Sequence, residues 1–177
     1  DLKRGIIRCV GDPERRFRED ALRMLRAWRF SAQLGFSIEE HTARAIRENA
    51  GLCRLLSRER VCAEAEKTLL SPRPETLSVM LREGLLAACG IEGDYELHAL
   101  KTVSAEADAR WAMLKVLIPK LDMQQFRLPS RRVQLAETAA AAYRPSYTRE
   151  ALKELIAASG EDAARVCAKL SAQEALL

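Results

Sequence analysis

The chain has 177 residues, enough for one ordinary domain or for two small helical domains that share an interface. Hydrophobic residues make up 48% and charged residues 31%, the balance of a soluble globular protein, and the excess of Ala, Leu, Arg and Glu over aromatic residues (5%) favours helix over sheet. The five cysteines form no C-x-x-C pair, only two histidines occur, and no signal peptide or bilayer-spanning apolar run is present. We therefore expect reduced thiols, no metal site within the chain, no membrane contact and a cytoplasmic location.

The positive charge is concentrated near the N-terminus. Residues 1–35 hold nine basic and five acidic side chains, so this stretch alone accounts for the net charge of +4. Clustered arginine indicates a polyanionic partner such as nucleic acid or a nucleotide phosphate. A solvated helix face with internal ion pairs would show the same charge pattern, and charge alone does not separate the two interpretations.

The first elements in the chain are a short extended piece and a long helix. Residues 6–10 favour an extended strand, which we expect to end at Gly11. Asp12 can cap a helix whose first position is Pro13. We predict that this helix continues to about Leu34 and ends at Gly35.

Two more helices precede the clearest break in the chain. Ser37 and Glu40 have capping-box spacing, which predicts a helix reaching about Asn49. Another helix runs from about residue 57 to residue 70. The Pro-rich segment 71–74 follows it, and we place a domain boundary there, between residues 1–71 and residues 72–177.

Beyond residue 71 the pattern stays helical in shorter pieces separated by Gly and Pro. The predicted pieces are about 74–83, 85–89, 95–101, 105–118, 121–126, 130–142, 148–158 and 161–175. No strand is expected after the first ten residues. The predicted fold is all-α, an irregular multi-helix array without a substantial sheet.

The long N-terminal helix carries the charged residues that are candidates for a functional site. On a 3.6-residue period one broad face collects Arg16, Glu19, Asp20, Arg23, Arg26 and Ala27. This spacing predicts the ion pairs Arg16–Asp20, Glu19–Arg23 and Asp20–Arg23. Exposed pairs of this kind contribute only about 0.3–0.5 kcal/mol each, so stability alone is a weak reason to concentrate them here.

Hydrogen-bond geometry offers a functional reason. A carboxylate only accepts and a guanidinium only donates, so Asp20 and Arg23 would present an acceptor beside a donor. Cytosine and adenine offer an amino donor beside a ring-nitrogen acceptor and match that pair. Uracil and guanine present the reverse order, and each buried mismatch costs about 1–3 kcal/mol. The pair could therefore accept C and A and reject U and G without a template.

The residues around this helix resemble those of a known family. They comprise Ile7-Arg8-Cys9-Val10-Gly11-Asp12-Pro13, the run RFREDALRMLRAWRF from Arg16 to Phe30, Gln33-Leu34-Gly35-Phe36-Ser37-Ile38-Glu39-Glu40, and Glu59-Arg60-Val61 with Glu64. Together they closely resemble the class II tRNA nucleotidyltransferase and bacterial poly(A) polymerase family. Residues 75–177 agree with that family mainly in helical character.

The resemblance implies a division of labour. In the family an N-terminal head carries a five-stranded catalytic fold with a G-S…D-x-D metal site, a helical neck reads the incoming nucleotide, and a helical body and tail bind the tRNA acceptor stem. At matching positions, Asp20 and Arg23 would read the base, with Glu19, Arg26 and Arg16 as supports. The helix that braces the neck would contain Glu59, Arg60 and Glu64. CTP and ATP would be the substrates, the tRNA 3′ end the partner and Mg²⁺ the metal of the whole enzyme.

The departures from the family pattern concern the catalytic part. The chain contains no D-x-D, no G-S loop, no R-R-D-F-like segment and no H-D pair, so carboxylates for two Mg²⁺ ions are absent. Cys62 stands where an arginine often follows the equivalent of Arg60-Val61. Because the sequence begins at Asp1 without methionine, we expect a neck and body whose head domain is missing and which is inactive alone.

Basic residues near two predicted helix starts are candidates for RNA contact, since phosphates suit helix N-termini. They are Arg127, Arg131, Arg132, Arg144 and Arg149. For each of them, an ordinary exposed arginine is the alternative. For the whole chain, the alternatives are a stand-alone helical RNA-binding module, the equivalent part of a poly(A) polymerase, or an arginine helix that only packs and carries charge.

Overall fold

The computed structural model describes residues 1–171, and this part of the chain folds almost entirely into helices, so the all-α prediction is confirmed. The α-helices are α1 (Pro13–Glu19), α2 (Leu22–Leu34), α3 (Glu40–Asn49), α4 (Arg58–Leu69), α5 (Thr76–Arg82), α6 (Ala107–Leu117), α7 (Ser130–Ala142), α8 (Arg149–Ser159) and α9 (Glu161–Leu170). Short 3₁₀ helices are η1 (Leu2–Arg4), η2 (Ala50–Leu55), η3 (Ala87–Cys89), η4 (His98–Thr102) and η5 (Met123–Phe126). Two strands, β1 (Ile6–Ile7) and β2 (Ser37–Ile38), complete the elements.

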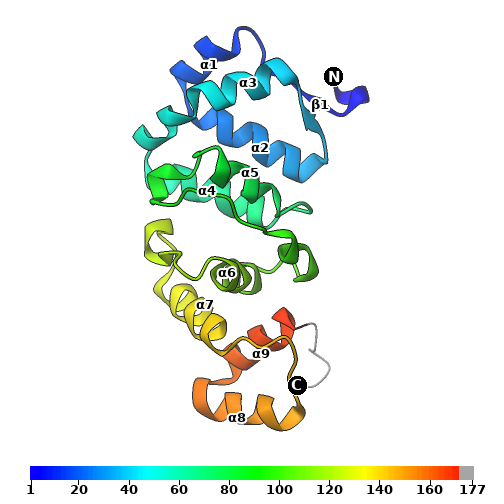
Figure 1. Cartoon of the computed structure of the whole chain (residues 1–177), viewed down its shortest axis with the longest axis vertical. Coiled ribbons are helices and arrows are strands. Elements are labelled where there is room, and N and C mark those ends of the chain that lie inside the picture. The colour runs from blue at the N-terminus through cyan, green and yellow to red at the C-terminus, as the bar shows by residue number, and fades with distance from the viewer. Residues whose placement is uncertain (172–177) are drawn as a thin grey trace.

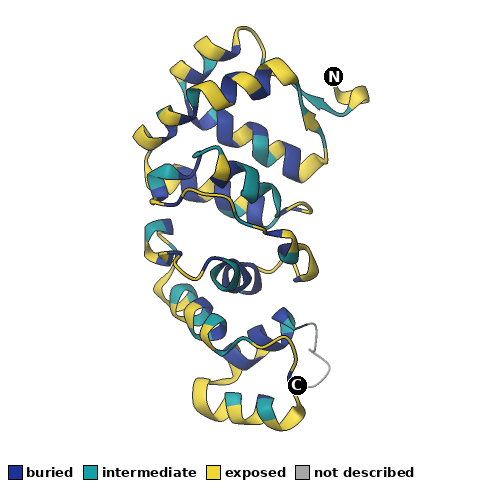
Figure 2. Ribbon diagram, viewed as in Figure 1, coloured by how far each residue is buried: buried dark blue, intermediate teal, exposed yellow. Residues whose placement is uncertain are grey.

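The helices are stacked along one long axis. Figure 1 shows α1, α2 and α3 together at the N-terminal end, α4 and α5 beneath them, then α6 and α7, and finally α8 and α9. Helix α1 packs on α3, α2 packs on α4, and α6, α7 and α9 pack on one another. In Figure 2 the buried faces of the helices point toward the neighbouring layers. The order of the elements in the sequence is thus largely their order in space.

The prediction of one long helix over residues 13–34 is wrong in one respect, because this segment forms two helices. Helix α1 ends at Glu19, and Asp20 adopts an extended conformation with φ −153° and ψ 100° before α2 begins at Leu22. The Asp20 carboxylate accepts a hydrogen bond from the backbone N–H of Leu22 at 3.2 Å. Asp competes with the helix for backbone hydrogen bonds in this way, and here that competition ends one helix and starts the next.

The predicted capping box at Ser37 is also wrong. Ser37 and Ile38 form strand β2, which pairs in parallel with β1, so a short strand does follow the first ten residues. Helix α3 is instead capped by Glu39, whose carboxylate accepts from the backbone N–H of Thr42 at 2.8 Å. The predicted start of α1 is confirmed, since Asp12 accepts from the N–H of Glu14 at 3.0 Å and Pro13 is the first helical residue.

A buried arginine connects the segments on either side of the Pro-rich stretch 71–74. The Arg110 side chain is 5% exposed and donates to the carbonyl oxygens of Leu69 at 2.7 Å and Val103 at 3.0 Å. Close by, Trp111 packs edge-to-face on Phe126, with ring centroids 5.1 Å apart. The division into residues 1–71 and 72–177 stays a prediction.

The C-terminal elements follow the predicted ranges closely. Helices α7 and α8 match the predicted 130–142 and 148–158, whereas the predicted pieces 85–89, 95–101 and 121–126 are 3₁₀ helices. Helix α9 begins at Glu161 as predicted and ends at Leu170. Residues 172–175 of that prediction lie outside the described residues.

Candidate functional site

The junction of α1 and α2 holds the two residues predicted to read a base. Because Asp20 lies in the extended turn between the helices, it and Arg23 do not share one continuous helix face. The predicted pairs Arg16–Asp20 and Asp20–Arg23 are not formed within residues 1–171, whereas Glu19–Arg23 is formed at 3.1 Å. Acceptor and donor are therefore neighbours that are held by different partners.

Glu19 organises the arginines around it. Its Oε2 accepts from Arg16 Nη1 at 2.7 Å and from Arg23 Nη1 at 3.1 Å, and its Oε1 accepts from Arg15 Nε at 3.2 Å. The hydrogen bond from Arg23, aided by Arg16 and Arg15, lowers the pKa of Glu19 below its ordinary value. The carboxylate thus stays ionised and fixes the guanidinium of Arg23.

Arg23 keeps donors available for a ligand. Its Nη1 spends its two N–H groups on Glu19 and on the carbonyl oxygen of Arg16, at 3.1 and 3.0 Å. A guanidinium has five N–H donors, so three remain at Nε and Nη2 without a partner in the described part of the chain. The side chain is 31% exposed, which makes these donors reachable.

Asp20 is held from another helix. Arg60 Nη2, at the start of α4, lies 3.2 Å from Asp20 Oδ1 and 3.3 Å from Oδ2. With the N–H of Leu22 on Oδ1, three of about four acceptor positions of this carboxylate are used, and its side chain is 28% exposed. An acceptor position on Asp20 is therefore left for a donor from outside.

The same helix α4 anchors α2 through a buried carboxylate. Glu64 is 5% exposed, and its Oε2 lies 2.5 Å from Arg29 Nε. Arg26 and Lys67 approach Oε1 at 3.9 and 3.7 Å. Arg26 is thus oriented loosely by α4. The resemblance predicted that Arg60 and Glu64 lie on the helix that braces the neck. It did not predict that Arg60 contacts Asp20, which lies 40 positions earlier in the sequence.

A cavity of about 210 Å³ opens beside this junction. Its lining consists of Ile7, Arg8, Cys9, Phe17, Arg23, Arg26, Ala27, Phe30 and Thr42. The volume is below the range of about 300–1,000 Å³ that is usual for small-molecule sites, so it would enclose only part of a nucleotide. Arg23 and Arg26 come from the predicted set, whereas Thr42 and Phe30 were not predicted to bind a ligand.

The arginines predicted to contact RNA differ in their availability. Arg132 donates to Asp108 at 2.9 Å and to Glu66 at 2.8 Å, which ties α7 to α6 and α4. Arg127 lies 3.6 Å from Glu59. Arg132 is thus engaged within the fold.

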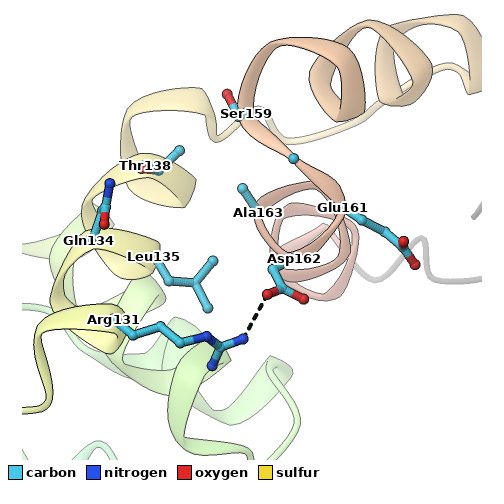
Figure 3. A pocket seen from close by; sticks show the side chains of 9 residues that line it. Arg131, Gln134, Leu135, Thr138, Ser159, Glu161, Asp162 and Ala163 are labelled. Carbon is cyan, nitrogen blue, oxygen red and sulfur yellow. Dashed lines mark hydrogen bonds and ion pairs between the residues drawn. The ribbon is translucent and has the colours of Figure 1, made fainter.

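Arg131 reaches across a groove to α9. Arg131 lines this groove together with Gln134 and Thr138, and, as Figure 3 shows, its guanidinium extends to Asp162, whose Oδ2 it contacts at 2.7 Å. Arg144 and Arg149 are exposed, and neither forms an ion pair within residues 1–171. These two are therefore the most available of the predicted set.

Neither a metal centre nor a membrane span can be built from the described residues. Within residues 1–171, no three His, Cys, Asp or Glu side chains converge to hold a metal ion. The same residues provide no helix with the length and apolar character needed to cross a bilayer. At the α1–α2 junction, the groups available to a ligand are the hydrogen-bond donors of Arg23 and an acceptor position of Asp20.

Comparison with known proteins gives consistent matches along the chain. Residues 35–89 match the family described as "Probable RNA and SrmB- binding site of polymerase A". The CCA-adding enzyme of Leuconostoc mesenteroides is 51% identical over 87 residues, which are 49% of this chain and 22% of that protein. The CCA-adding enzyme of Bacillus velezensis is 36% identical over 166 residues, which are 86% of this chain and 42% of that protein.

The fold has a close counterpart among solved structures. The crystal structure of the Bacillus stearothermophilus CCA-adding enzyme in complex with CTP matches with a TM-score of 0.75 and 31% identity. The match covers 98% of this chain and 51% of that one. The chain spans less than half the length of these two curated relatives and about half of the solved chain.

Proposed function

This chain belongs to the class II tRNA nucleotidyltransferase family, and we propose that it supplies the part of such an enzyme that selects CTP and ATP and holds the tRNA 3′ end. Selection is the work of Asp20 and Arg23 in the neck, residues 1–71. The helical body and tail, residues 72–177, contact the acceptor stem. The new phosphodiester bond forms in a catalytic head outside these residues.

The proposal rests on one observation: at the α1–α2 junction, a hydrogen-bond acceptor and a hydrogen-bond donor are each held by a different partner. Arg60 holds the Asp20 carboxylate, and Glu19 holds the Arg23 guanidinium. Each of the two retains hydrogen-bonding capacity toward solvent. An amino group beside a ring nitrogen, as in cytosine and adenine, matches that pattern, and a carbonyl beside a ring N–H does not.

The other predicted nucleotide-binding residues act around this pair. Arg16 donates to Glu19 and so helps to hold Arg23 through that carboxylate. Arg26 lines the 210 Å³ cavity with Arg23, and its exposed guanidinium is suited to the negative charge of a triphosphate. Glu19 is a positioning residue, since its oxygens are occupied by three arginines.

For the RNA we propose contacts through exposed arginines of the body. Arg144 and Arg149 suit phosphate contacts best, because they are exposed and no carboxylate of residues 1–171 pairs with them. Arg127 and Arg131 would have to exchange Glu59 and Asp162 for a phosphate. Arg132, bound to two carboxylates, would support the α6–α7 packing while adding positive charge to this face.

Mg²⁺ belongs to the whole enzyme in this proposal. The residues described here do not fit a two-metal site, because no group of three or more carboxylate, thiol or imidazole side chains converges within them. No step of the proposed selection therefore passes through a metal ion.

Nucleotide incorporation into tRNAs that end before, within and after CCA tests the proposal. The intact enzyme should add C and A, and Asp20→Ala or Arg23→Ala should relax or abolish this preference. The 177-residue chain alone should incorporate nothing with Mg²⁺. Unchanged preference in either variant would refute the base-reading assignment, and robust incorporation by the chain alone would refute the separate head.

One observation favours a second candidate. The family matched by residues 35–89 is described for polymerase A, so the chain could instead be the equivalent part of a bacterial poly(A) polymerase. The same assay separates the two. A poly(A) polymerase would extend RNA with A alone and for many residues, whereas the CCA-adding enzyme would stop once CCA is complete.

A further inference from the structure

Two buried cysteines from different segments meet inside the helical stack. Cys62 on α4 and Cys89 at the end of η3 place their Sγ atoms 3.6 Å apart. They are the only cysteine pair in hydrogen-bonding contact, and all five cysteines lie within the described residues. The base-selecting residues use neither thiol, so the pair needs its own explanation.

The surroundings of the pair make the two thiols chemically unequal. The hydrogen bond with Cys89 lowers the pKa of Cys62, and the nearby Arg127 guanidinium adds to this effect, while burial and Glu59 oppose it. The same contact and burial raise the pKa of Cys89. Cys62 is the more accessible of the two, 7% exposed against 2% for Cys89, and it lies near the Arg127 guanidinium, which favours its thiolate. Since the thiolate is the nucleophile in thiol chemistry, Cys62 is the attacking sulfur and Cys89 the one that resolves the product.

Access to Cys62 is limited by side chains that can move. The residue is 7% exposed and lies beside the ion pair of Glu59 and Arg127, whose side chains are themselves well exposed. Its Sγ also faces the carbonyl oxygen of Gln125, 3.8 Å away on the single-turn helix η5. Opening of this turn and of the ion pair would admit a small reagent. Cys53 and Cys167, in contrast, are fully buried.

We propose that Cys62 and Cys89 form an oxidisable dithiol site, which low-molecular-weight disulfides convert into an intramolecular disulfide between α4 and η3. The Cys62 thiolate attacks one sulfur of the small disulfide, and the first small thiol leaves and takes up a proton. Cys89 then loses its proton and attacks the Cys62 sulfur, which releases the second small thiol. The two cysteines are oxidised and one small disulfide is reduced to two thiols.

The cross-link requires a modest movement. The two sulfurs must approach from 3.6 Å to a bond length of about 2.05 Å. Helix η3 is a single turn followed by Gly90, whose φ of 70° already lies in the left-handed region. This short segment can shift toward α4 more easily than α4, which packs on α2, can shift toward it.

Oxidised glutathione is a suitable probe for the folded 177-residue chain at neutral pH. Free thiols are blocked by alkylation afterwards, and the protein is digested and analysed by mass spectrometry without reduction. The expected digest contains a peptide linking Cys62 to Cys89 that is about 2 Da lighter than the two thiol peptides together, and the link reverts with a dithiol reductant. Cys53→Ala is the matched control, because it removes a buried thiol that has no cysteine neighbour and should leave the cross-link intact.

Two cysteine variants separate the roles of the sulfurs. Cys89→Ala should stop at a glutathione adduct on Cys62, whereas Cys62→Ala should leave Cys89 unmodified. Circular dichroism shows whether each variant is folded, and the result for the unaltered chain does not depend on them. Five free thiols after treatment, or a cross-link that joins any other pair, would overturn the proposal.

Discussion

Replacing Asp20 by asparagine should relax nucleotide selection and leave the α1–α2 junction folded. The carbonyl of asparagine can still accept from the N–H of Leu22, now 3.2 Å from Asp20 Oδ1, because asparagine and aspartate both form this hydrogen bond to the backbone two residues on. The ion pair with Arg60 is lost, but that side chain is half exposed, so the loss costs about 0–1 kcal/mol. For a domain of this size such a loss lowers Tm by at most about 4 °C.

The effect on selection should be larger than the effect on stability. An asparagine amide can turn its NH₂ toward the carbonyl of uracil or guanine, which removes one of the two mismatches that Asp20 and Arg23 impose. One unpaired buried group costs about 1–3 kcal/mol, and 1.4 kcal/mol is tenfold in rate. The kcat/KM for UTP relative to CTP should therefore rise by about 5- to 150-fold. Arg23 still faces the ring N–H, so discrimination is reduced but not abolished.

The assay compares kcat/KM for the four nucleoside triphosphates on a tRNA that lacks its CCA end, in the intact enzyme. Asp12→Asn is the matched control. It changes the charge by the same amount at an aspartate that also accepts from the N–H two residues on, since Asp12 accepts from Glu14 at 3.0 Å, and it lies outside the proposed base site. An unchanged CTP-to-UTP preference in Asp20→Asn, or equal relaxation in Asp12→Asn, would refute the reasoning.

Three further outcomes follow from charges elsewhere in the fold. Glu64→Gln should lower the free energy of unfolding by about 3 kcal/mol in urea titrations, because the carboxylate is 5% exposed and its partner Arg29 12% exposed, while the exposed Glu161→Gln should change it little. Burial raises the pKa of Glu83 above its ordinary 4.5. Protonation of Glu83 therefore stabilises the folded protein below pH 4.5, and this stabilisation is lost as the pH rises through the pKa of the folded state. Because glutamine stays neutral, the unfolding midpoint of Glu83→Gln should rise relative to that of the unaltered protein over this pH range, and parallel pH curves for the two proteins would contradict this. Replacing Arg144 and Arg149 together by alanine should weaken tRNA binding and reduce the slope of log K against log salt by about 0.9 for each lost phosphate contact; an unaltered slope would remove both from the RNA interface.

The helices were predictable because their ends carry local signals. Pro13 and Gly35 mark the start of α1 and the end of α2, and Gly160 separates α8 from α9. These residues fix or free the backbone whatever the tertiary contacts, so sequence alone locates them. The 3₁₀ character of the short pieces was not predictable, because a single turn has too few residues for periodicity to distinguish the two helix types.

The elements that sequence reasoning misjudged depend on contacts between distant residues. No Gly or Pro announces the end of α1, and Asp20 breaks the helix because its carboxylate bonds to Leu22 and Arg60. Ser37 could cap a helix by spacing, yet it joins β2 because Ile6, far earlier in the chain, pairs with it. The candidate site shows the same limit, since residue types and spacing named Asp20 and Arg23 but not the partners that separate them.

The break between α1 and α2 explains how an aspartate and an arginine three positions apart can both remain available. In an unbroken helix the i,i+3 spacing would let Asp20 and Arg23 pair with each other, and a donor satisfied by its own acceptor cannot read a base. Here Asp20 leaves the helix and is held by Arg60, while Arg23 is held by Glu19. Both side chains are thus fixed before a ligand arrives, which lowers the entropy cost of binding and sharpens selection. The feature that sequence analysis took for a continuous helix is therefore the one on which the proposed base selection depends.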